Sequence, residues 1–278
     1  MKRQYLYSLF FIPILAVWGQ DIIQEVIRSE QGLLDRVVYL EITQNSHRKV
    51  KEVDFHDNGN KFRSKTFDKA GEVKMVTEWY RSGQKKLEHS FKKGKKNGLW
   101  TTLYEKGNKE SEKTYVSDLI HGLVHHWNEK GELRYQGNFI ADALSNVSVK
   151  NGRITEWYKN GQKEKETTWS NGVLNGEWAE WFENGQSMFE GSYLNGVIDE
   201  SLTEWYSNGQ KKEDGTISAL GSAGMIKDGT WIKWYLNGQE QEKGRFIKGD
   251  KDGPWAYWYS NGQKKAQGAY KDGYEHGP

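Results

Sequence analysis

Carboxylates recur at one place in several segments of this chain, and they are the first residues to consider for chemistry. Glu78, Glu156, Glu180 and Glu204 each stand directly before a tryptophan. Two carboxylates at a suitable separation are what a glycoside hydrolase needs. An active site normally interrupts a repeated pattern rather than recurring in it. We therefore expect these residues to be structural and the chain not to be an enzyme, with a hydrolase built on Glu156 or Glu204 as the weakest alternative.

The residue types that bind metals and cofactors follow no recognisable motif. The chain has seven histidines and no cysteine, and His125 and His126 are the one adjacent pair of histidines. Neighbouring residues of a strand point to opposite faces, so these two cannot readily hold one ion together. The sequence shows no nucleophile motif, phosphate-binding loop or dinucleotide-binding fingerprint. It therefore predicts no catalytic residues, no metal and no cofactor.

A short pattern that occurs nine times indicates how these residues are arranged. An aromatic residue, two residues of any type and usually an asparagine lead to a glycine, which is often followed by Gln-Lys. These tip glycines are Gly59, Gly83, Gly107, Gly131, Gly161, Gly185, Gly209, Gly238 and Gly262. Six of the eight intervals between them are 24 residues long, and the other two are 30 and 29. A fixed period of this length is typical of a stacked array of one structural unit.

Each unit of this array is predicted to be a β-hairpin. Six of the nine tip glycines follow an asparagine, and Asn-Gly between apolar residues favours a two-residue type I′ turn. A large apolar residue stands eight positions after every tip glycine, and a glycine-rich return follows. The sequence therefore predicts an all-β fold, an elongated single-layer antiparallel meander of about nine tandem β-hairpin repeats with a period of about 24 residues.

The aromatic residues of the repeats divide between the two faces of the predicted sheet. Alternation along a strand places one tryptophan of each repeat opposite the face that carries Trp100, Trp178, Trp231 and Trp255. This tryptophan row, the candidate partner or ligand face, consists of Trp79, Trp157, Trp181, Trp205, Trp234 and Trp258. The favoured interpretation is packing between repeats. The alternative is an aromatic strip that is open to a partner.

The first residues of the chain resemble a secretory signal peptide. Lys2 and Arg3 precede an apolar run that is too short to span a bilayer, and small-residue spacing allows cleavage near Gly19. Residues 1–19 are therefore predicted to be removed, with an uncleaved anchor as the alternative, and the protein to be exported to the periplasm or cell surface. Without these residues the chain carries 38 basic and 38 acidic residues, since Lys2 and Arg3 are subtracted from 40. This balance argues against nucleic acid as a partner.

The rest of the chain divides into a cap and the repeats. Residues 20–54 are predicted to form an N-terminal capping segment, with strands over residues 35–43 and 49–55, although residues 22–34 could instead form a short helix. Residues 55–278 hold the repeats, with expansions at residues 137–152 and 214–229. The last complete strand, near residues 267–270, is predicted to be an exposed edge that could pair with another chain.

These patterns resemble the MORN repeat family, in the variant form found in bacterial proteins of the YwqK type, a group commonly labelled antitoxins. The resemblance covers roughly residues 55–278. It rests on the strings WYRSGQKK (79–86), WYKNGQKE (157–164), WFENGQ (181–186), WYSNGQKK (205–212), WYLNGQE (234–240) and WYSNGQKK (258–265). It implies a twisted sheet of hairpins that mediates contact with proteins or membrane lipids, and it implies no catalytic residues.

The expected function is that of an exported, non-enzymatic scaffold that mediates protein–protein interaction at the bacterial cell envelope. One alternative is a lipid- or glycan-binding module that uses the tryptophan row. Another is the antitoxin of a toxin–antitoxin pair, which would retain residues 1–19.

Overall fold

The computed structural model describes residues 6–8, 22–44, 46–221 and 224–276. Every regular element in these ranges is a β-strand, which confirms the predicted all-β class. The chain divides into two compact units. Unit 1 comprises Met1–Leu133 and Phe139–Ser148, and unit 2 comprises Arg134–Asn138 and Val149–Pro278.

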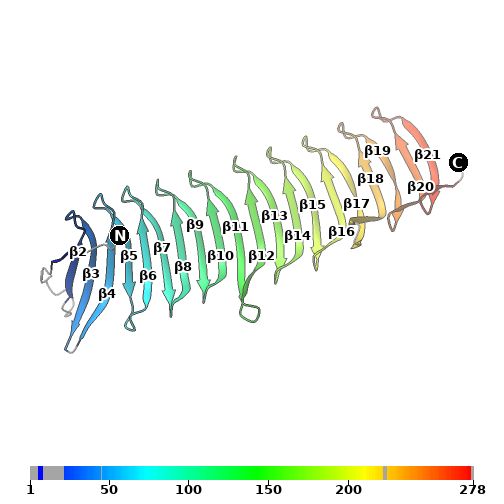
Figure 1. Ribbon diagram of the computed structural model, residues 1–278. Coiled ribbons are helices and arrows are strands. Elements are labelled where there is room, and N and C mark those ends of the chain that lie inside the picture. Colours follow the sequence, from blue (N-terminus) through cyan, green and yellow to red (C-terminus); the bar gives the residue numbers. More distant parts are fainter. Residues whose placement is uncertain (1–5, 9–21, 45, 222–223, 277–278) are drawn as a thin grey trace. The chain divides into compact units, whose positions relative to one another are not determined.

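Unit 1 is an antiparallel meander in which each strand pairs with the next strand along the chain (Figure 1). Its strands are β1 (Leu6–Ser8), β2 (Ile22–Arg28), β3 (Leu34–Thr43), β4 (Ser46–Phe55), β5 (Lys61–Phe67), β6 (Val73–Trp79), β7 (Lys85–Lys92), β8 (Lys95–Leu103), β9 (Lys109–Val116) and β10 (Leu119–Trp127). Strand β11 (Leu133–Asp142) and the start of β12 (Val147–Trp157) are divided between the units.

Unit 2 repeats the same arrangement from β12 onward. Its further strands are β13 (Lys163–Ser170), β14 (Val173–Trp181), β15 (Ser187–Leu194), β16 (Val197–Trp205), β17 (Lys211–Gly221), β18 (Gly224–Trp234), β19 (Glu240–Ile247), β20 (Asp250–Trp258), β21 (Lys264–Lys271) and β22 (Tyr274–Glu275). The pairing of consecutive strands in both units confirms the predicted meander of hairpins.

The N-terminal region is built of strands. Residues 22–28 form β2, so the alternative of a helix over residues 22–34 is wrong, and β3 and β4 contain the two strands predicted for the cap. Within the predicted signal peptide, β1 pairs with β2, with Leu6 opposite Arg28. The predicted cleavage position near Gly19 lies outside the described residues. The two expansions mainly lengthen strands: β12, β17 and β18 have 11 residues each, whereas β14 has nine.

The tip turns differ from the predicted type I′ turn. In the repeat of Gly209, the amide of Tyr206 donates to the carbonyl of Gln210 (2.8 Å), and the amide of Gly209 donates to the carbonyl of Tyr206 (2.9 Å). Only the glycine of this loop has a positive φ, +83°. This is a three-residue loop in which a type I turn is followed by a left-handed glycine. The prediction of a two-residue turn at the tips was therefore wrong.

Two-residue turns with two positive φ angles occur instead at the returns between repeats. Ser170 pairs with Val173, and the two residues between them, Asn171 and Gly172, have φ angles of +48° and +84°. These are the backbone angles that a type I′ turn requires. An Asn-Gly pair thus serves both turn types, and the length of the loop around it decides which one forms.

The asparagine before the tip glycine connects one repeat to the next. Asn208 Oδ1 accepts the amide of Gln210 (3.0 Å), and Asn208 Nδ2 donates to the carbonyl of Leu236 in the following tip (2.9 Å). Beside it, the Tyr206 hydroxyl donates to the carbonyl of Trp234 (3.0 Å). Equivalent bonds to the next tip are made by Asn58, Asn160, Asn184 and Asn237 and by Tyr80, Tyr104, Tyr158 and Tyr235. We call these bonds the tip ladder.

The apolar core of unit 2 lies on one face of the sheet, which we call the core face, whereas in unit 1 Val37 and Val53 are buried on the opposite face. The core face carries the residue seven positions before each tip glycine, and the buried apolar members of this set are Val124, Ile154, Leu202, Trp231 and Trp255. In unit 2 a glycine lies beside the tryptophan on the neighbouring strand. A Cβ atom added to Gly244 would be 2.2 Å from the Trp255 ring, so this indole lies directly over the glycine. A single-layer sheet can thus bury a large aromatic side chain where the residue beneath it is a glycine, which has no side chain.

Candidate functional site

The predicted tryptophan row ends successive strands just before the tips. Its six members are the last residues of β6, β12, β14, β16, β18 and β20, and all are partly buried. Alternation along the strands places them on the face opposite the core face, which we call the tryptophan face. Within each unit the described strands pack on their neighbours in the same sheet, and no second layer of described strands covers this face. The row is therefore accessible in part.

Lysine side chains of the preceding repeat lie over three of the six rings, those of Trp79, Trp181 and Trp234. Lys163 Nζ lies 5.4 Å from the ring centroid of Trp181 and 2.8 Å from Glu166 Oε2. Lys211 lies in the same way 5.7 Å from Trp234 and 2.6 Å from Asp214 Oδ2. Such cation–π contacts and exposed ion pairs each contribute about 0.5–1 kcal/mol or less. A partner could displace these lysines at little cost and contact the rings.

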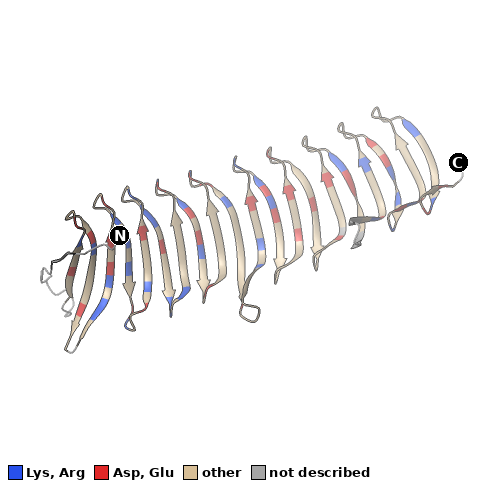
Figure 2. Cartoon of the chain, in the orientation of Figure 1, with Lys and Arg blue, Asp and Glu red and all other residues tan. Residues whose placement is uncertain are grey.

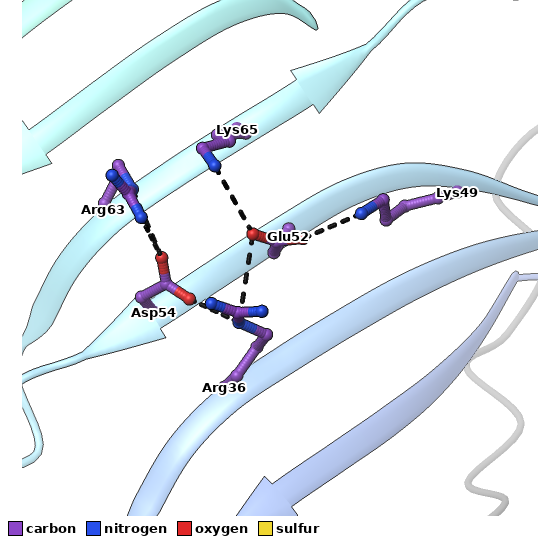
Figure 3. Close-up of polar contacts among 6 residues, drawn as sticks. All are labelled: Arg36, Lys49, Glu52, Asp54, Arg63 and Lys65. Carbon is purple, nitrogen blue, oxygen red and sulfur yellow. Dashed lines mark hydrogen bonds and ion pairs between the residues drawn. The ribbon is translucent and has the colours of Figure 1, made fainter. Parts of the chain in front are cut away.

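Charged residues of both signs lie side by side on the strands (Figure 2). In unit 1 the carboxylates of β4 are enclosed by cations from three strands (Figure 3). Asp54 accepts from Arg36 (2.6 Å) on β3 and is 3.1 Å from Arg63 on β5. Glu52 is 2.9 Å from Lys49 and 3.8 Å from Lys65.

On the core face, Glu52 stands at the position where unit 2 carries Trp178, Trp231 and Trp255, and Asp54 stands at the position of the recurrent glutamates. Both residues are buried, with 7% and 8% of their surface exposed. Burial alone would raise the pKa of Glu52, but the hydrogen bond from Lys49 and the charges of Arg36, Lys49 and Lys65 together hold it below its usual value. Glu52, whose pKa is lowered in this way, is poorly suited to donate a proton.

His89 is a residue of this face that the sequence pattern did not single out. It occupies a position, six residues after the tip glycine, where four of the five complete repeats of unit 2 have glycine. Its ring stacks on Trp100 with 3.7 Å between centroids. Burial and the nearby charge of Lys96 lower the pKa of His89 to about 4, so the ring is neutral at pH 7. A histidine at a position that holds glycine in five of the nine repeats was the available signal.

Two of the four recurrent glutamates are held by neighbouring lysines. Glu180 is 2.7 Å from Lys165 and accepts a bond from the Trp178 indole (3.2 Å), and Glu204 is 2.6 Å from Lys212. His125 stacks on Trp127 rather than joining its neighbour. Among the described residues there is no group of three or more side chains that could hold a metal ion. No helix in the described ranges is long and apolar enough to cross a membrane.

The C-terminal edge is partly paired. Tyr270 and Lys271 on β21 pair with β22, and the amide of His276 donates to the carbonyl of Ala269 (2.8 Å). The predicted edge near residues 267–270 is therefore covered in its second half by the chain itself.

Three segments of the chain match the MORN repeat variant family, at residues 150–171, 174–195 and 251–272. These matches confirm the resemblance that the repeated strings indicate. No curated protein matches the chain.

Two solved structures are similar to the chain at low identity. One is a crystal structure of TcdB2-TccC3-TEV, with 10% identity, a TM-score of 0.23, and coverage of 90% of this chain and 17% of that chain. The other is the crystal structure of a porin-like protein from Bacteroides uniformis, with 9% identity, a TM-score of 0.14, and coverage of 95% of this chain and 90% of that chain. The chain thus spans less than one fifth of the length of the first structure.

Proposed function

We propose that this chain, which carries MORN variant repeats, is an exported, non-enzymatic scaffold that binds another protein at the bacterial cell envelope. The observation that supports this proposal is the tryptophan face, where one partly exposed indole recurs at the end of alternate strands. Tryptophan is enriched among the residues that contribute most to protein–protein binding, at about 2 kcal/mol or more each. The lysine and carboxylate pairs around the row would form the polar rim of such an interface.

The geometry suits a partner that extends across several repeats. In unit 2, successive members of the row lie two strands apart, which corresponds to roughly 9.5 Å along a sheet. A partner that contacts three members would therefore span about 20 Å. Each contact is weak alone because the ring is already half-buried, so binding would depend on several repeats acting together.

The test is capture of a partner from the envelope fraction with the full chain and with the double variant Trp181→Ala/Trp205→Ala. A matched control is Val173→Ala/Leu194→Ala, which removes two exposed apolar side chains outside the row (44% and 54% exposed). We expect one protein to be retained by the wild type and the control and lost with the tryptophan variant, and to bind the purified chain directly.

Two results would contradict the proposal. If the tryptophan variant unfolds, as judged by circular dichroism, the row serves packing between repeats. If vesicles or oligosaccharides bind in place of a protein and depend on the same tryptophans, the protein is a lipid- or glycan-binding module. Export is tested separately, by N-terminal sequencing of the protein recovered from the envelope fraction, which we expect to begin near residue 20.

A further inference from the structure

One repeat of unit 2 departs from the others at two positions on the tryptophan face. The residue five positions after the tip glycine is acidic in five repeats, namely Glu88, Glu112, Glu166, Glu190 and Asp214. The residue seven positions after the tip glycine is Thr, Ser or Asn in the first seven repeats, from Thr66 in the first to Thr216 in the seventh. In the repeat of Gly238 these positions hold Lys243 and Arg245. Two cations thus stand where the other repeats have an acid and a small polar residue.

Neither cation has a partner of the kind that the other repeats provide. Where the residue five positions after the tip glycine is acidic, its carboxylate bonds to the side chain three positions earlier, as Glu190 does with Ser187 (2.8 Å). The repeat of Gly238 has the reverse order, Glu240 and then Lys243. Within the described ranges of unit 2, neither Lys243 nor Arg245 makes an ion pair, although Asp252 is opposite Arg245 in the register. Both side chains are exposed.

The two cations border a hollow with small residues at its base. The hollow has a volume of about 630 Å³ and lies over β18 to β21. Pro254 and Ala256 on β20 and Ala269 on β21 leave room above the strands, and Thr230 and Gln267 add polar groups at the sides. A base of small apolar residues with a basic border provides both area and charge for an anionic ligand.

We propose that this hollow binds an extended acidic segment of a partner protein, with Lys243 and Arg245 pairing with carboxylates. The two cations are two residues apart on one strand, which sets their Cα atoms roughly 6.6–7 Å apart. Alternate side chains of an extended peptide have the same spacing, so two carboxylates in an i, i+2 arrangement match the two cations. The intervening side chain of an extended peptide points away from the cations, so the peptide backbone would lie over Pro254 and Ala256. The proposal rests on the proposed function only in taking a protein as the partner.

The test measures binding of a six-residue peptide with alternating Glu and Val by the full chain. The control peptide Glu-Glu-Val-Val-Glu-Val has the same composition and charge but no two Glu in an i, i+2 arrangement. The variant Lys243→Glu/Arg245→Thr restores the residue types of the other repeats, so it should fold normally. The variant Lys248→Asn/Lys271→Glu gives the same change of charge on exposed residues of the same unit.

We expect the alternating peptide to bind the wild type and the control within a factor of two, and the restored variant to bind at least tenfold more weakly. Binding should also weaken as salt is raised from 50 mM to about 500 mM, since the contacts are ionic. Equal binding of the two peptides would overturn the proposal, as would absence of binding. Stronger binding of inorganic phosphate, or of vesicles containing phosphatidylglycerol, through the same two residues would also overturn it. Trp181 and Trp205 are on other strands, so these outcomes are distinguishable from failure of the capture experiment.

Discussion

The close packing of tryptophan over glycine in unit 2 makes a quantitative prediction about two glycines at equivalent positions. Gly244 and Gly268 each stand six residues after a tip glycine, and neither has a positive φ. A Cβ atom at Gly244 would be 2.2 Å from the buried Trp255 ring, whereas at Gly268 the nearest atom would be 3.9 Å away. Ordinary contact begins at 3.4 Å, so Gly244→Ala requires a shift of about 1.2 Å (3.4 minus 2.2) and Gly268→Ala requires none.

The expected cost follows from what the Trp255 side chain would lose. This residue is 2% exposed, and a fully buried tryptophan hides about 200 Å² of surface, which corresponds to about 5 kcal/mol if the ring were expelled. If the Trp255 ring is displaced by part of the required 1.2 Å and is not expelled, Gly244→Ala should lower the free energy of unfolding by about 2–3 kcal/mol, within the range for overpacked cores. Gly268→Ala should be neutral or stabilise the fold by up to about 1 kcal/mol, because alanine restricts the unfolded chain.

Hydrogen exchange of the amides of β19 and β20 is the appropriate assay, since repeat arrays can unfold in parts and a single global transition is not assured. We expect faster exchange in Gly244→Ala and unchanged or slower exchange in Gly268→Ala. In a double-mutant cycle, Trp255→Leu should relieve part of the cost of Gly244→Ala, because Leu202 occupies the equivalent position beside Gly191. Equal effects of the two alanines, or no coupling in the cycle, would refute the packing argument.

Three further predictions concern the polar contacts. Tyr235→Phe removes the bond to the Trp258 carbonyl and should lower the free energy of unfolding by about 0.5–1.5 kcal/mol in urea titrations. Tyr259→Phe should have a smaller effect, because the Tyr259 hydroxyl makes no hydrogen bond within the described residues. His89 has a folded pKa of about 4, below its ordinary 6.5, so the unfolded state takes up the proton first and stability should fall as the pH drops through this window. Allowing for partial exposure of the ring, we expect a loss of about 1 kcal/mol between pH 7 and pH 5, absent in His89→Gln, and a flat difference between the two proteins would contradict it. Asp54→Asn should lower the free energy of unfolding at pH 7 by about 1–2 kcal/mol in urea titrations, because it removes the charge that pairs with Arg36 and Arg63. The loss is moderate because both arginines still reach water. An unchanged urea midpoint would show that the ion cluster is dispensable.

The sequence predicted the fold through the tip glycines, because a period of 24 residues and alternation along strands are local properties. It did not predict the type of tip turn. Asn208 and Gly209 are compatible with a two-residue loop, and the closing bonds between Tyr206 and Gln210 become evident only when the strand ends are paired. The role of Asn208 as a link to the next repeat depends on the distance between tips, which no single repeat contains.

The functional residues were predictable to a similar extent. Alternation placed Trp181 and Trp205 on one face, but the position of Lys163 over Trp181 depends on cross-strand register, which the loop length sets. The departure at Lys243 and Arg245 is visible in an alignment of the repeats. Its significance is recognisable only once Pro254 and Ala256 are seen to leave space beside it.

The two rims of the sheet differ in where insertions occur, although both carry bonds between repeats: the tips bond through side chains, and the returns bond through the backbone, as the Gly172 amide does with the Lys150 carbonyl (2.8 Å). A tip is fixed by its own turn and by side-chain bonds to the next tip, so an inserted residue there would break contacts in two repeats. Both expansions lie at the other rim, and Leu144, in the first of them, is fully exposed. Lineages that vary this architecture should therefore acquire new segments at the returns and keep the tips constant. For the same reason, residues 143–146 are the place to graft a loop or a label without disturbing the array.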